Sequence, residues 1–428
     1  MTETANIYTL PSGLRLIHVP SQSPVAYCGI AIDAGTRDEL PTEQGMAHFC
    51  EHMLFKGTAH RHAWHIINRM ERVGGDLNAY TNKEETVVYS AFMKEDLPRA
   101  AELLFDVVFH SVYPQIEIDK EREVIVDEIE SYNDSPADLI FDHFENIIYE
   151  GRDLGHDILG TADDVRRFTS ADAQAFTRRL YKPERMIFFV LGDYDFKYVK
   201  RTLKALTEAL SPAPSPIMGR GEQVTGLKET TRMASPPNRG GGVGGEGLLF
   251  IEHRSTHQAH VMIGCAAYGS KDDRRIALYF LNNLLGGPGM NSRLNIALRE
   301  RRGLVYTVES TLTNYTDTST WAIYFGCDAE DVEKCRRLVR KELDRLMQMP
   351  LTAQQFAAAM KQIKGQIGVA CDNSENYILD TAKSFLHYNK FEGMNDTYQQ
   401  LDKLTPQFLQ QVACEVFAPQ NLTTLIFQ

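Results

Sequence analysis

Residues 86–108 read TVVYSAFMKEDLPRAAELLFDVV, and residues 321–343 read WAIYFGCDAEDVEKCRRLVRKEL. The two segments align without a gap. Each begins with alternating apolar residues, which predict a strand, continues through an acidic pair such as Glu95-Asp96, and ends in an amphipathic helical pattern. The simplest explanation of two such units in one chain is a duplicated α+β domain.

The segments around the first copy extend this prediction. The strand patterns GLRLIHVP and PVAYCGIAIDAG come first, helical patterns and the strand patterns DLNAYT and ETVVYSAFM follow, and long helices come last. Hairpin strands followed by runs of helices are typical of an α+β fold rather than a doubly wound sheet. We therefore expect two homologous α/β-sandwich-like domains, residues 1–210 and 248–428, each with a mostly antiparallel sheet packed with helices.

The stretch between the two halves has a different composition. Residues 211–247 are rich in Pro, Gly and Ser, which predicts a linker. It contains a G-x-G-x-x-G pattern at Gly240, Gly242 and Gly245, but the pattern follows no strand and leads into the strand pattern GLLFIEH. A dinucleotide-binding loop should open a helix instead, so the context argues against that function.

Composition excludes several classes of protein. With 43% hydrophobic and 24% charged residues the 428-residue chain is typical of a soluble globular protein. A net charge of -12 argues against nucleic-acid binding, and seven scattered cysteines without a CxxC pair argue against a disulfide framework or a thiolate zinc site. No apolar run is long enough to span a membrane, and MTETANIYTLPSG has no basic leader or apolar core, so we expect a cytoplasmic protein.

A candidate metal motif lies at residues 47–57, AHFCEHMLFKG. On a helix, His48 and His52 lie about 40° apart on one face, so both imidazoles can reach one ion. Glu51 stands beside them, where it can take a proton from a metal-bound water. The order HxxEH is the inverted form of HExxH, a signature of zinc peptidases. A catalytic zinc site needs one more protein ligand.

The second half of the chain lacks these polar residues. In its matching segment, ALYFLNNLLGG at 277–287, Leu278 replaces His48, Leu281 replaces Glu51 and Asn282 replaces His52. The helix evidently does not need them to fold. The first half is therefore expected to carry the chemistry, and the second half only the architecture.

The third ligand is predicted from a second helical segment, DKEREVIVDEIESYNDS at 119–135. Glu121 and Glu128 are two turns apart and share one face. The matching helix of the second half has Ala359 and Gln366 there, so both carboxylates are lost together with the histidines. This joint loss favours Glu128 as the third ligand and Glu121 as a residue that orients a ligand or the water.

Other candidate ligands have simpler explanations. Cys50 lies on another face of the motif helix and is interpreted as a small buried thiol. His60, His62 and His65 are dense, but Arg61 and the loop-like GTAHRHAW favour a solvated helix start over a second metal site.

Several motifs together resemble one known family. Over nearly its whole length the chain resembles the pitrilysin/insulinase zinc peptidases, most closely their shorter, processing-peptidase-like members. The motifs that carry the resemblance are LPSGLRLIHVP, AGTRDELPTEQGMAHFCEHMLFKGT, GGDLNAYTNKEETVVYSA, EREVIVDEI and, in the second half, MNSRLNIALRERRGLVYTVES.

The resemblance implies a role for each site residue. His48, His52 and Glu128 would bind one Zn²⁺ per chain, Glu51 would be the general base, and Glu121 would support the site. An extended peptide would add to the edge strand DLNAYTN, where Asn78 and Ala79 hold its main chain. Arg299 and Tyr306 match an Arg and a Tyr that approach the scissile carbonyl. Without the resemblance, Asn78 would be an ordinary strand-end residue, Arg299 a surface charge on a helix and Tyr306 the start of a strand.

The resemblance also implies an assembly. Longer members enclose a chamber with four such units, whereas this chain has two. We expect a homodimer whose two sites are completed in trans; a heterodimer with a metal-free homologue is the other possibility. The expected function is zinc-dependent hydrolysis of peptides or unfolded polypeptide segments. The alternative is a non-catalytic scaffold or core subunit that keeps the peptidase fold.

Overall fold

The computed structural model describes residues 4–210, 247–254 and 256–428. The glycine pattern at 240–245 and all but one residue of the expected linker, 211–247, lie outside these ranges. Within them, no helix combines the length and the apolar character needed to cross a membrane.

The described residues form two compact units. The first contains the described residues of 4–127, 157–210 and 371–392, and the second those of 128–156, 247–254, 256–370 and 393–428. The domains expected from the sequence are continuous, whereas each of these units includes one segment from the other half of the chain.

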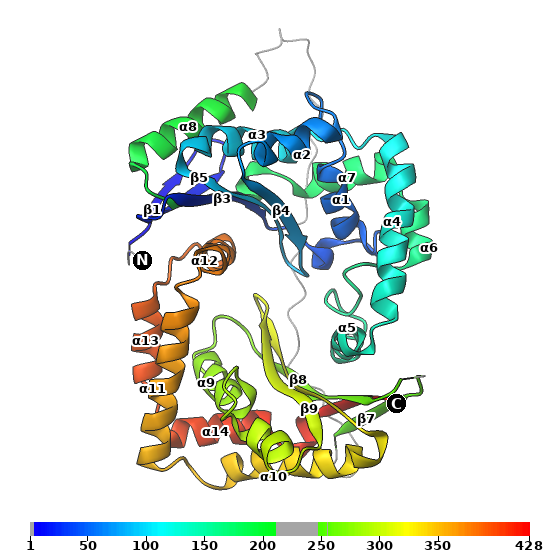
Figure 1. Ribbon diagram of the computed structural model, residues 1–428, viewed down its shortest axis with the longest axis vertical. Coiled ribbons are helices and arrows are strands. Elements are labelled where there is room, and N and C mark those ends of the chain that lie inside the picture. The colour runs from blue at the N-terminus through cyan, green and yellow to red at the C-terminus, as the bar shows by residue number, and fades with distance from the viewer. Residues whose placement is uncertain (1–3, 211–246, 255) are drawn as a thin grey trace, which may run out of the picture. The chain divides into compact units, whose positions relative to one another are not determined.

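The first unit is built on a six-stranded sheet with the order β1-β2-β6-β3-β5-β4 (Figure 1). Its strands are β1 (Asn6–Thr9), β2 (Arg15–Pro20), β3 (Val25–Ile32), β4 (Asp76–Thr81), β5 (Thr86–Met93) and β6 (Met186–Gly192). Its helices are α1 (Met46–Leu54), α2 (Ala63–Glu71), α3 (Leu97–Phe109), α6 (Ala162–Arg167), α7 (Ser170–Leu180), α8 (Phe196–Leu210) and α12 (Ser374–Tyr388). Helix α4 (Gln115–Asn133) starts in this unit and runs without a break past Asp127 into the residues assigned to the second.

The second unit has a five-stranded sheet with the order β7-β11-β8-β10-β9. Its strands are β7 (Leu248–Glu252), β8 (Ala259–Tyr268), β9 (Val305–Asn314), β10 (Thr318–Cys327) and β11 (Thr423–Phe427). Its helices are α5 (Pro136–Ile148), α9 (Arg275–Gly286), α10 (Val332–Gln348), α11 (Ala353–Ala370), α13 (Met394–Asp402) and α14 (Pro406–Val416), with a π-helix at Asn295–Glu300.

The two sheets share one topology. Strand β2 pairs in parallel with β6 in the first sheet and β7 in parallel with β11 in the second, and all other neighbours are antiparallel. If β2, β6, β3, β5 and β4 are matched to β7, β11, β8, β10 and β9, the strand orders coincide. The predicted α+β fold with mostly antiparallel sheets and an internal repeat is confirmed.

Both faces of each sheet are covered, which explains the unbroken apolar run MIFFVLG of β6, where every residue is buried. In the first unit, α3 packs on one face, where the rings of Phe105 and Phe188 lie 5.7 Å apart, and α12 packs on the other with Ile378 and Phe385 (Figure 1). In the second unit, α9, α10 and α14 cover one face and α5 the other. Each sheet is thus completed by a helix from the other half of the sequence.

Candidate metal centre

Helix α1 is held at its start by a glycine and a carboxylate. Gly45 adopts a φ of 88°, and a Cβ there would lie 2.6 Å from the Leu159 carbonyl oxygen, so only glycine fits. The Glu39 carboxylate accepts from the Gly45 and Ala47 amides at 3.0 and 2.8 Å. A carboxylate at a helix N-terminus satisfies free amides and complements the helix dipole. The sequence therefore fixes where the motif helix begins.

The two histidines of the motif lie next to each other, as their spacing predicts. The ring centroids of His48 and His52 are 4.6 Å apart. His48 is buried, and this burial, together with the nearby His52, lowers its pKa to about 3. The His48 imidazole is therefore neutral at physiological pH, which is the form that binds a metal.

Helix α4 places a carboxylate against the second histidine. Glu121 Oε1 lies 3.0 Å from His52 Nδ1, and Glu121 Oε2 lies 2.6 Å from Lys56 Nζ. Burial opposes ionisation of Glu121, but the hydrogen bonds from His52 and Lys56 lower its pKa below the usual value. Because an ionised carboxylate can only accept, Nδ1 of His52 carries the proton, and its Nε2 has the lone pair available for a metal.

The third predicted ligand reaches the same place. His48, His52 and Glu128 each offer a ligand atom, and these atoms all lie within 4.8 Å of one another. Glu128 is seven residues beyond Glu121 on the continuous helix α4, so two turns of one helix face α1. Two imidazole nitrogens and one carboxylate oxygen are a donor set that suits Zn²⁺ and leaves a fourth position for water. The residues therefore fit the metal that the sequence predicts.

The other residues of helices α1 and α4 that the sequence singled out differ in their burial. Glu51 is half-buried on α1, next to His52 in the chain. Cys50 is fully buried, its Sγ lies 3.9 Å from the Ala173 carbonyl oxygen, and it belongs to neither potential metal cluster of the described residues. On α4, Ile125 and Ile129 are buried, whereas Val124, expected on the same apolar side, is 51% exposed.

The second unit has an apolar version of this arrangement. On α9, Leu278 and Leu281 are buried, and Asn283 Nδ2 donates to Gln366 Oε1 of α11 at 2.9 Å. Gln366 stands where Glu128 stands in the first half. Among the residues that the structure describes, neither potential metal cluster lies on α9 or α11. Asn283 matches Met53 of the first half, one position after the Asn282 that replaces His52, so a neutral amide pair joins α9 and α11 close to the positions of the metal ligands.

The predicted substrate residues lie on the edge strand β4. Asn78 is exposed and pairs with Tyr89, and Ala79 is half-buried and pairs with Val88. Strand β4 has β5 on one side and is the last strand of the sheet on the other, and α1 contacts it. The main chain of β4 therefore offers an edge beside the helix that carries the two histidines; its use by a substrate stays a prediction.

Arg299 and Tyr306 lie against each other in the second unit. Arg299 is on the π-helix, and its guanidinium carbon lies 5.5 Å from the centre of the Tyr306 ring. Tyr306 follows the first residue of β9 and is 78% exposed, which is unusual for a ring of its size. π-Helical turns are frequent at functional sites. The structure brings the two residues together, and their approach to a substrate carbonyl stays a prediction.

Sequence reasoning missed two features of the first unit. Lys56 lies two residues beyond Leu54, the last residue of α1, so helical spacing does not predict its ion pair with Glu121. His110 was also missed: together with Asp106 and His60 it forms a second group whose ligand atoms lie within 4.8 Å of one another. His60 and His110 are far apart in the sequence, so no local pattern could have joined them.

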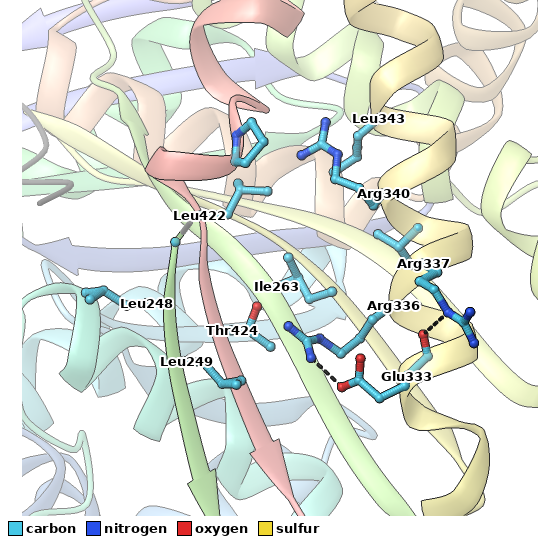
Figure 2. Close-up of a pocket in the computed structure, with 13 residues that line it drawn as sticks. Leu248, Leu249, Ile263, Glu333, Arg336, Arg337, Arg340, Leu343, Leu422 and Thr424 are labelled. Carbon is cyan, nitrogen blue, oxygen red and sulfur yellow. Dashed lines mark hydrogen bonds and ion pairs between the residues drawn. The ribbon is translucent and has the colours of Figure 1, made fainter. Parts of the chain in front are cut away.

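One cavity of the second unit lies apart from the predicted site residues. It has a volume of about 450 Å³ and lies between helix α10 and strands β7, β8 and β11, with Leu248 and Leu249 on one side and Arg336 and Arg340 on the other (Figure 2). None of the predicted site residues lines it. The candidate centre is therefore defined by its side chains and not by this cavity.

Comparisons with known proteins agree with the geometry. A family profile described as insulinase (peptidase family M16) matches residues 16–162, and one described as the peptidase M16 inactive domain matches residues 167–363. The first includes all three candidate metal ligands, and the second includes α9 and part of α11 but ends before Gln366.

Similar proteins cover nearly the whole chain. An uncharacterized zinc protease of Streptomyces coelicolor is 32% identical over 98% of this chain and 88% of its own length. The mitochondrial-processing peptidase subunit beta of Saccharomyces cerevisiae is 29% identical over 92% of this chain and 85% of its own. The crystal structure of a protease from Helicobacter pylori, 23% identical, has a TM-score of 0.86 and covers 100% of this chain and 99% of its own, which shows a shared fold.

The names of these relatives support a peptidase function, as the motifs predict. The two family profiles follow one another along the chain, and the Streptomyces relative is above 30% identity over most of both chains. This chain therefore belongs to the insulinase family of peptidases, peptidase family M16.

Proposed function

We propose that this chain is a zinc-dependent endopeptidase that hydrolyses peptides or unfolded polypeptide segments within a chamber formed by two chains. The main observation that supports the proposal is the position of His52, between Glu121 and the other two candidate ligands. Its Nδ1 is held by Glu121 at 3.0 Å, and it shares a cluster with His48 and Glu128. A carboxylate behind a histidine fixes the tautomer and raises the basicity of the other nitrogen toward a metal.

His48, His52 and Glu128 would hold one Zn²⁺. When bound, zinc lowers the pKa of a water ligand and polarises the carbonyl of the scissile peptide. Glu51 would accept the proton that the attacking water loses and would return it to the leaving amine. Lys56, 2.6 Å from Glu121 Oε2, keeps that carboxylate ionised and so keeps His52 in the metal-binding tautomer.

Substrate would bind along β4. An extended peptide can pair with the edge of a sheet through main-chain hydrogen bonds, which give affinity without demanding a particular side-chain sequence. Asn78 and Ala79 are the residues of β4 proposed to hold it, and α1 lies in contact with the same strand. A requirement for extended backbone would favour peptides and unfolded segments over folded proteins.

The proposed assembly is a homodimer with sites completed in trans. This proposal is supported because a single chain contains both the candidate metal cluster and the contacting pair Arg299 and Tyr306. These two side chains would bind the oxyanion that forms at the scissile carbonyl, or the substrate next to it. The alternative assembly, a heterodimer with a metal-free homologue, predicts that the purified chain alone is inactive.

The deciding experiment combines zinc analysis with cleavage of a quenched fluorescent peptide mixture. The wild type should contain zinc, cleave the peptides, lose activity with a chelator and regain it with added Zn²⁺. Glu51→Gln should retain zinc but cleave at least about 100-fold more slowly. A matched control is Glu71→Gln, a glutamate at the exposed end of α2, which should behave as wild type. A protein that binds zinc but cleaves no peptide alone or with a partner chain would instead be a scaffold.

A further inference from the structure

We propose that His60, Asp106 and His110 form a second site for a divalent transition metal, distinct from the centre at His48. This outer cluster lies within the first unit, and none of its members has a role in the peptidase mechanism proposed above. Its potential ligand atoms all lie within 4.8 Å of one another. The sequence alone favours a solvated helix start for His60, because Arg61 and the loop-like GTAHRHAW surround it. Asp106 and His110 come from a different part of the chain.

The two imidazoles converge on one carboxylate oxygen. His60 Nδ1 lies 2.6 Å and His110 Nδ1 lies 3.1 Å from Asp106 Oδ1, and the ring centroids of the two histidines are 4.6 Å apart. In a tetrahedral zinc shell with bonds near 2.0 Å, neighbouring ligand atoms are about 3.3 Å apart. Each imidazole nitrogen therefore needs to move away from Asp106 Oδ1 by less than about 1 Å to admit an ion in place of the proton between them.

The rest of the carboxylate is fixed by neutral and cationic donors. Asp106 Oδ2 accepts from Arg61 Nη1 at 2.6 Å and from Thr58 Oγ1 at 2.9 Å. Asp106 is only 3% exposed, so these contacts hold it in one orientation. Carboxylate ligands of metals are commonly hydrogen-bonded in this way through the oxygen that does not bind the ion. Oδ1 is left facing the two imidazoles.

The main chain holds the histidines in place before any ion arrives. Ala59 N donates to the His110 carbonyl oxygen at 2.8 Å, and Thr58 forms a β-bridge with Ser111. Asp106 and His110 are four residues apart at the end of α3, so they share one face of that helix. Little conformational entropy would be lost when the three donors bind an ion, because their backbones are already tied together.

Exposure and donor type indicate which ion fits. The His60 side chain is 58% exposed and that of His110 is 31% exposed, so an ion and its water ligands can enter from solvent. Two imidazoles with one carboxylate favour Zn²⁺, Co²⁺ or Ni²⁺ over Ca²⁺ and Mg²⁺. The Arg61 guanidinium already neutralises part of the Asp106 charge, so this site should bind more weakly than the cluster at His48.

A bound ion would link two connecting segments. His60 lies between α1 and α2, and His110 lies just before α4 begins at Gln115. Helices α1 and α4 carry the three ligands of the proposed catalytic zinc. An ion at the outer cluster would therefore hold together the segments next to these two helices, and its expected effect is greater thermal stability without a direct part in catalysis.

Metal counting on the full-length protein tests the site. Metal-free protein is loaded with Zn²⁺ or Co²⁺, desalted and analysed for bound metal, and its unfolding temperature is measured. The wild type should bind about two ions per chain, and a mild chelator should remove one before the other. The double variant His60→Ala, His110→Ala should lose about one ion and the metal-induced stabilisation it gives, while peptide cleavage at low zinc persists. The control His65→Ala, an exposed imidazole on α2, should still bind two.

A third variant separates this proposal from the proposed function. His48→Ala should lose the catalytic ion and keep the outer one, so its remaining ion should disappear when His60 and His110 are also replaced. If the protein proves not to be a zinc enzyme, the outer cluster alone still predicts about one ion per chain that depends on His60 and His110. The outer site would be overturned if the wild type binds a single ion and the double variant keeps it. The conservative variant His60→Gln guards against misfolding. If it binds the second ion with the same affinity as the wild type, the outer site is also overturned.

Discussion

His52 Nδ1 lies 3.0 Å from Glu121 Oε1, so two helices that are far apart in the sequence are joined through one imidazole. The contact decides which nitrogen of the ring holds the proton. It also explains why Glu121 is buried and yet ionised, since His52 and Lys56 both donate to it and lower its pKa.

Replacing Glu121 with Gln should weaken zinc binding by about 10- to 100-fold. An amide can still accept from His52 but does not stabilise the imidazole as a charged carboxylate does. Competition with a chromophoric chelator measures the affinity. Glu123→Gln, an exposed residue on the same helix, is the matched control and should bind zinc as the wild type does. Equal affinities for both variants would show that Glu121 does not support the site.

Two inactive chains should restore activity when they are combined, if the sites are completed in trans. Glu51→Gln and Tyr306→Phe each disable one component. In a co-expressed one-to-one mixture, half of the dimers pair the two variants, and one of the two sites in each contains both native residues. The expected activity is about a quarter of the wild-type value. Activity no higher than that of the separate variants, measured on a preparation shown to contain mixed dimers, would contradict completion in trans.

Blocking the substrate's main chain should prevent cleavage in an alternating pattern. If a peptide pairs with β4, every second amide of the peptide donates to the strand and the others point away. N-methylation at successive positions of one good substrate should therefore raise KM strongly at alternate sites only. Steady-state kinetics on the methylated series provide the measurement. A uniform effect, or none, would exclude pairing along Asn78 and Ala79.

Glu85 should stabilise the docking of α12 on the first sheet. Its side chain is fully buried, with Oε2 2.9 Å from His387 Nε2 and Oε1 2.8 Å from Lys383 Nζ. Removing one partner of such a buried group costs about 3 to 5 kcal/mol, because the remaining charge is left unpaired. Urea unfolding of Glu85→Ala at pH 7 should show a loss of this size. The exposed Glu95→Ala should change stability by about 0.5 kcal/mol or less.

The Glu85 carboxylate should also make the stability of the protein depend on pH in acid. Burial opposes ionisation of Glu85, but His387 and Lys383 lower its pKa from 4.5 to about 2. A folded pKa below the unfolded one means that the stabilisation is complete above about pH 4.5 and is lost as the pH falls toward 2. The difference in unfolding free energy between the wild type and Glu85→Gln should therefore be smaller at pH 3 than at pH 7. A difference that grows in acid would contradict the assigned pKa.

The residues of the candidate metal centre could be predicted from the sequence because each of its parts is a local pattern. His48 and His52 are four residues apart, Glu121 and Glu128 are seven apart, and helical periodicity places each pair on one face. The internal repeat added a comparison within the chain, since Leu278 and Gln366 stand where ligands stand in the first half. The same periodicity misplaced Val124, because packing against neighbours and not period alone decides exposure.

Other features depended on contacts between distant residues. In the outer cluster, His60 is 46 residues away from Asp106 in the sequence, and His110 is 4 residues away from it. The exchange of α5 and α12 between the two halves also has no local signal, since an amphipathic helix does not specify which sheet it covers.

The sequence by itself determined the elements of this protein, their repetition and the residues of its candidate metal site, because periodicity and spacing act within one helix or strand. The tertiary structure alone decided that Glu121 meets His52, that Glu85 anchors α12, and that two imidazoles converge on Asp106. The physical reason is that hydrogen bonds and burial between distant segments form only when the sheets and helices pack, and packing depends on the whole core and not on any one stretch of the chain.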